Sequence, residues 1–91
     1  MEDERRDELN ESVKRARLIN RLVESEGWTD IVRPALEGKK ELYLSQFREA
    51  KELDEFVIAQ QSINAIDWLF GFIESTLAMG EDSVKELKKE P

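Results

Sequence analysis

Apolar residues recur at three- and four-residue steps over much of this 91-residue chain, which is the spacing of amphipathic helices. The longest stripe contains the following residues: Phe56, Ala59, Ile63, Ile66, Phe70, Ile73 and Leu77. Asp54 precedes the stripe and is a residue type that favours helix N-caps. Gly80 follows it and indicates a helix end, because glycine adopts the left-handed conformation at little cost. The pattern predicts a long helix over residues 54–79.

Two further segments, residues 9–24 and 34–52, show the same helical spacing. The Ser25–Trp28 stretch separates them, and Trp28 is expected to fill the core at this corner. Pro34 either kinks the chain or opens a new helix in its first turn. A single helix over residues 34–79 would be long for a small domain, so we expect a turn near residues 52–54.

We therefore predict an all-α fold with an antiparallel helical hairpin, made of residues 34–52 and 54–79, and an additional N-terminal helix over residues 9–24. Residues 9–80 would form one helical domain. The almost fully charged residues 1–8 are expected to be disordered, and the charged tail over residues 81–91 is expected to fray.

The segment from Ile66 to Ile73 carries more apolar surface than one helix stripe needs, because Trp68, Leu69 and Phe72 flank the main stripe. Either the first helix covers this surface or a second subunit or another partner does. We expect a protein interface here, in the manner of a coiled coil, formed by the following residues: Ile66, Trp68, Leu69, Phe70, Gly71, Phe72 and Ile73.

Two smaller features have alternative interpretations. Gly71 and Ser75 either allow close approach of another helix or mark a tolerated kink. Lys14, Arg17 and Arg21 either form a basic strip for an acidic partner or lie on a solvated helix face.

Charge is unevenly distributed along the sequence. The net charge is −7, and residues 52–84 contain seven acidic residues and no Lys or Arg. A pI near 4.7 argues against binding to nucleic-acid phosphates, so we expect no direct nucleic-acid contact.

The residue inventory excludes several kinds of chemistry. The chain contains no His and no Cys, so nucleophilic systems built on either are impossible within it. Asp67 and Glu74 lie two turns apart, where a carboxylate pair could exchange protons or bind a divalent ion, or simply keep an apolar surface soluble. We expect a non-enzymatic protein with no catalytic residues, metal or cofactor.

No membrane contact is expected, because the apolar run Trp68–Ile73 is far shorter than the roughly 20 residues that span a bilayer. The charged N-terminal stretch lacks the features of a secretory signal peptide.

Two motifs resemble a group of small helical-hairpin proteins encoded by tailed bacteriophages. The first is the lead-in Leu22-Val-Glu-Ser-Glu-Gly-Trp28, and the second is the run Ala59-Gln-Gln-Ser-Ile-Asn-Ala-Ile66 at a similar spacing. Ser62 replaces a glycine of the group's pattern, and Pro34 and the aromatic cluster near Trp68 depart from it. The resemblance implies a helical hairpin from a phage genome, often associated with virion-structure genes, in the host cytoplasm or in the virion.

Two functions follow from these features. The first is a phage structural or assembly protein that acts through helix-mediated contacts, either as a homo-oligomer or with a virion protein. The alternative is an acidic inhibitor of a host or defence protein, in which residues 52–84 mimic nucleic acid.

Overall fold

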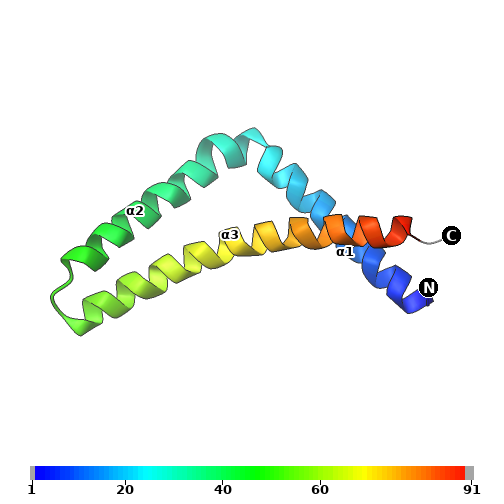
Figure 1. The fold of residues 1–91 in the computed structure, drawn as a ribbon. Coiled ribbons are helices and arrows are strands. Elements are labelled where there is room, and N and C mark those ends of the chain that lie inside the picture. The colour runs from blue at the N-terminus through cyan, green and yellow to red at the C-terminus, as the bar shows by residue number, and fades with distance from the viewer. Residues whose placement is uncertain (1, 90–91) are drawn as a thin grey trace. The chain divides into compact units, whose positions relative to one another are not determined.

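The computed structural model describes residues 2–89, which are almost entirely helical (Figure 1). Helix α1 spans Asp3–Glu24, a short π-helix η1 spans Trp28–Val32, α2 spans Arg33–Glu49 and α3 spans Leu53–Lys88. The described residues contain no β-strand. The prediction of an all-α chain with three α-helices is therefore confirmed.

The chain divides into two compact units. The terminal unit consists of Met1–Ser25 and Phe72–Pro91, and the central unit consists of Glu26–Gly71. Helix α3 contributes its first half to the central unit and its second half to the terminal unit. Each unit has its own small core.

In the terminal unit, α1 runs antiparallel to the second half of α3, and small residues set their separation. A methyl group on Gly80 would lie 2.1 Å from the Cβ atom of Ala16 and 3.5 Å from the carbonyl oxygen of Ser12. Ser83, one turn beyond Gly80, is buried, as are Leu9 and Ile73. Because glycine has no side chain, the two helix backbones come close at Gly80.

Both ends of the terminal unit differ from the predicted boundaries. Helix α1 begins at Asp3 instead of near residue 9, and α3 continues past Gly80 to Lys88 instead of ending near residue 79. Two interactions support the longer helices. Asp3 and Glu4 place negative charge at the N-terminus of α1, and the Arg5 guanidinium donates to the Glu86 carboxylate at 2.9 Å. Residues 1, 90 and 91 of the two predicted flexible ends lie outside the described residues.

Gly80 has a different role from the predicted one. Among the described residues no glycine has a positive φ, so Gly80 does not form a left-handed cap. The close helix approach that the sequence suggested for Gly71 is found at Gly80 instead, since nothing lies within 4 Å of a methyl group placed on Gly71. Gly71 is a tolerated mid-helix glycine.

The core of the central unit is built on aromatic rings. Trp28 is buried and meets Phe70 edge to face, with ring centroids 6.3 Å apart. Phe47 and Phe56 make a second edge-to-face contact at 5.4 Å. Ala59, Ile63 and Ile66 of α3 are also buried. The expectation that Trp28 fills the core is confirmed.

The corner that holds Trp28 depends on Ser25 and Pro34. Ser25 adopts an extended conformation that ends α1, and its hydroxyl donates to the Leu22 carbonyl at 2.7 Å. The Arg33 amide then donates to the Trp28 carbonyl, a bond that reaches five residues back. Pro34 follows in the first turn of α2, where its missing amide costs little.

The turn between α2 and α3 comprises residues 50–52, slightly earlier than the predicted position. Ala50 is extended, so α2 cannot continue. The Glu55 carboxylate reaches back to accept a hydrogen bond from the Lys51 amide at 3.1 Å. This contact satisfies an amide just before α3 and fixes the start of the helix without Gly or Pro.

Candidate functional site

The seven residues predicted to form an interface are not equally exposed. Ile66 and Ile73 are buried, with 8% and 7% of their surfaces accessible. Leu69 and Phe70 are half-buried, and Phe70 contacts Trp28. The sequence therefore grouped core residues with surface residues.

The remaining three predicted residues reach the surface. Trp68 exposes 67% and Phe72 exposes 48% of its area, and Gly71 is exposed between them in sequence. The boundary between the units falls directly after Gly71, so Trp68 belongs to the central unit and Phe72 to the terminal unit. Trp68 is the most exposed aromatic side chain among residues 2–89.

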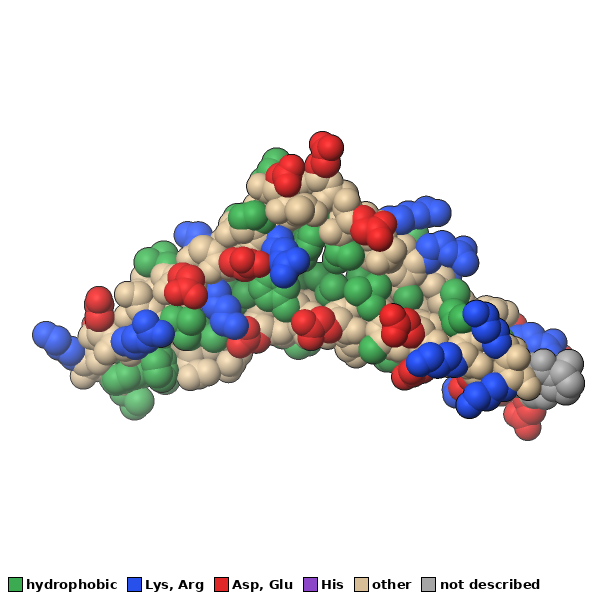
Figure 2. Space-filling view, turned by 45° about the horizontal axis from the view of Figure 1, so that its top comes forward, with side chains coloured by type: hydrophobic (Ala, Val, Ile, Leu, Met, Phe, Trp, Pro, Cys, Tyr) green, Lys and Arg blue, Asp and Glu red, His purple; other side chains and the backbone are tan. Residues whose placement is uncertain are grey.

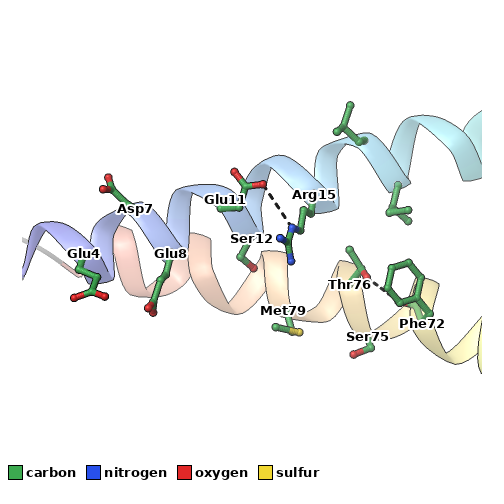
Figure 3. Close-up of a pocket in the computed structure, with 12 residues that line it drawn as sticks. Glu4, Asp7, Glu8, Glu11, Ser12, Arg15, Phe72, Ser75, Thr76 and Met79 are labelled. Carbon is green, nitrogen blue, oxygen red and sulfur yellow. Dashed lines mark hydrogen bonds and ion pairs between the residues drawn. The ribbon is translucent and has the colours of Figure 1, made fainter.

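The terminal unit also contains a groove between α1 and α3, with a volume of about 870 Å³ (Figure 3). It is lined by the following residues: Glu4, Asp7, Glu8, Glu11, Ser12, Arg15, Leu18, Ile19, Phe72, Ser75, Thr76 and Met79. These residues recur at three- and four-residue steps on both helices, so each helix presents one face to the groove.

The two ends of the groove differ chemically. Glu4, Asp7 and Glu8 lie at one end, whereas Phe72 and Thr76 lie toward the other (Figure 3). The groove lining also includes Leu18, which is 52% exposed, and Met79, which is 60% exposed. The Thr76 hydroxyl donates to the Phe72 carbonyl of its own helix at 2.8 Å.

The carboxylates in the groove outnumber the cations. Arg15 is the basic residue among those that line it, and it pairs with Glu11 at 3.6 Å. Arg5 bonds to Glu86 at 2.9 Å and also contacts Glu8 at 3.4 Å, and these two carboxylates, Glu86 foremost, raise the pKa of Arg5 above its ordinary value. Within residues 2–89, neither Glu4 nor Asp7 takes part in an ion pair.

The groove was not predicted from the sequence because of the boundary of α1. Its acidic end falls in residues 3–8, which were expected to be disordered. The signal that could have found it is the regular spacing of Glu4, Glu8 and Glu11 in register with Leu18.

The other surface features of the described residues do not indicate a particular ligand. Hydrophobic side chains reach the surface among acidic and basic ones in the space-filling view (Figure 2). Among the described residues no group of three acidic side chains could hold a metal ion. Asp67, considered above as one of a carboxylate pair, forms an ion pair with Lys40.

Helix α3 is long and apolar enough to cross a membrane by length and composition, with a mean hydropathy of 1.2 over an 18-residue window. This is weak evidence, because a helix in the core of a soluble protein passes the same test. The absence of membrane contact stays a prediction.

Comparison of the chain with protein-family models, with curated proteins and with solved structures finds no match.

Proposed function

We propose that this chain is a non-enzymatic protein that acts through helix-mediated contacts, by self-association or by binding a virion component. The observation that carries the proposal is the exposure of Trp68, two-thirds of whose surface faces solvent. Trp buries a large apolar area when covered, and it is enriched at the centres of protein interfaces.

The phage setting, in the host cytoplasm or the virion, rests on the two sequence motifs described above.

The proposal includes the antiparallel hairpin formed by α2 and the first half of α3. Three contacts support it: Phe47 with Phe56, Lys40 with Asp67, and Trp28 with Phe70. Along these pairs the first residue number falls as the second rises, which is the order expected of antiparallel neighbours.

Sedimentation equilibrium tests self-association, with Trp68→Ser as the diagnostic variant. We expect the wild-type chain to exceed its monomer mass of 10.6 kDa as concentration rises, and we expect Trp68→Ser to shift the assembly toward monomer. Leu53→Ser is the matched control, because Leu53 is a highly exposed apolar residue of the same helix outside the proposed contact. Equal effects of the two variants would show that Trp68 has no special role.

One observation also favours the acidic-inhibitor function. All seven acidic residues of the 52–84 segment are exposed: Glu52, Asp54, Glu55, Asp67, Glu74, Glu81 and Asp82. A surface of this kind would mimic nucleic acid toward a basic groove. A partner captured from host lysate at low salt should then be lost at high salt, whereas a partner held by apolar contacts should be retained.

A further inference from the structure

We propose that the groove of the terminal unit binds a cationic amphipathic helix of a partner protein. This surface is distinct from the Trp68 contact, so the inference stands whether or not the chain self-associates through Trp68. It commits to one occupant, a helix whose apolar side chains cluster toward one end and whose basic side chains cluster toward the other.

The shape of the groove fits a helix. Its walls are two antiparallel helices that approach closely at Gly80 and Ala16, and each wall presents residues at three- and four-residue steps. A third helix laid along such a pair would contact both rows, as in a three-helix bundle. From Glu4 to Leu18 the α1 wall extends roughly 21 Å, at about 1.5 Å per residue. The groove therefore accommodates about four turns of helix.

The apolar lining of the groove favours a partner with apolar side chains. Leu18, Phe72 and Met79 are about half exposed or more, although they line the same groove. Covering them with a partner's apolar side chains would remove this surface from water, which favours association.

The acidic end selects the charge of the occupant. Glu4 and Asp7 have no ion-pair partner among residues 2–89, and the Arg15 cation is shared with Glu11. Lys or Arg residues on the incoming helix would neutralise these carboxylates and set the direction in which the helix lies. The same carboxylates would repel anionic phospholipid headgroups and nucleic-acid phosphates, so a protein helix is the better fit.

A pair of synthetic peptides tests the proposal with the full-length chain. Both are amphipathic helices of about 15 residues, the length that matches roughly 22 Å of groove. One carries Leu and Lys, and the other carries Glu in place of every Lys. Isothermal titration should show that the Leu/Lys peptide binds with one-to-one stoichiometry and that the Leu/Glu peptide does not bind.

Two double variants with the same charge change locate the site. Glu4→Gln with Asp7→Asn removes charge from the groove without breaking an ion pair among residues 2–89, and it should weaken binding of the Leu/Lys peptide by about fivefold to tenfold. Glu81→Gln with Asp82→Asn is the matched control, since both residues are exposed in the same unit but do not line the groove. This control should bind the peptide like the wild-type chain.

A third variant tests the apolar lining of the groove. Met79→Gln replaces an exposed side chain by one of similar length, so the fold should be retained, and peptide binding should weaken. The Trp68→Ser variant should bind the peptide normally, which separates failure of this inference from failure of the proposed self-association.

Four results would overturn the inference. Equal weakening by both double variants would mean that the peptide responds only to the net charge of −7. Equal binding of the two peptides would remove the charge selection. Self-association that is abolished by Met79→Gln would place a second copy in the groove. Stronger binding to vesicles of phosphatidylglycerol than to the Leu/Lys peptide would place a lipid surface there.

Discussion

The terminal and central units pack pairs of helices by opposite means. In the terminal unit Gly80 and Ala16 let the backbones of α1 and α3 come close, whereas in the central unit Trp28 and Phe70 fill the space with large rings. Close approach leaves little apolar volume inside, so large side chains such as Phe72 and Met79 remain at the surface beside the contact. The difference teaches that a short chain can hold two helices together either by small residues or by large rings, and that each unit still exposes apolar side chains, Phe72 in one and Trp68 in the other.

The largest expected effect comes from removing the aromatic core of the central unit. Trp28→Ala should lower the free energy of unfolding by about 3–5 kcal/mol, because it deletes a buried ring and leaves a cavity. Urea denaturation followed by circular dichroism measures this change. Trp68→Ala is the control and should cost much less, since Trp68 is exposed; equal losses would mean that Trp28 is not the core residue.

The next effect concerns the close approach in the terminal unit. Gly80→Ala should lower the free energy of unfolding by about 2 kcal/mol, because its methyl group would lie 2.1 Å from the Cβ atom of Ala16 and the helices would have to separate. The improved helix propensity of alanine offsets at most about 1 kcal/mol of this loss. Thermal denaturation provides the measurement, and an unchanged or raised midpoint would rule out close packing at Gly80.

The same substitution at a glycine with open surroundings should change the free energy of unfolding in the opposite direction. Nothing lies within 4 Å of a methyl group placed on Gly38, so Gly38→Ala should raise the free energy of unfolding by about 0.5–1 kcal/mol through helix propensity. The two variants differ only in the surroundings of the glycine, and they should be compared under identical denaturation conditions. Destabilisation at Gly38 would reveal a contact that α2 does not show here.

The smallest effect is expected at the ion pair that joins the ends of the terminal unit. Arg5→Ala should change the free energy of unfolding less than any of the variants above, because the Arg5–Glu86 pair is exposed to solvent and salt. Hydrogen exchange of the first turn of α1 should nevertheless increase. An unaltered exchange rate would mean that the pair does not hold this turn.

The sequence predicted the helical class, the break after Ser25 and the burial of Trp28, because these depend on local spacing and residue type. It did not predict the ends of the terminal unit. Arg5 is held by Glu86, which lies far away in the sequence, and a run of charges alone resembles a disordered segment.

Gly80 shows why part of the candidate site was missed. A glycine after an apolar stripe favours a helix end, but glycine also permits close approach, and only the presence of Ala16 opposite decides between the two. Without the contact between Gly80 and Ala16, nothing in the sequence indicated that α1 lies beside Phe72 and Met79. The predicted seven-residue interface mixed buried and exposed residues for a similar reason. The spacing of apolar residues within one helix does not show which face of that helix another helix covers.

Tryptophan fluorescence measured together with sedimentation tests most directly whether Trp68 is covered by a partner. In a Trp28→Phe variant, Trp68 is the single tryptophan, and its quenching by acrylamide reports its exposure. We expect strong quenching at low concentration and marked protection as the sedimenting mass rises above 10.6 kDa. A mass that stays at 10.6 kDa with constant quenching, or an assembly in which Trp68 is still freely quenched, would contradict the proposed self-association through this residue.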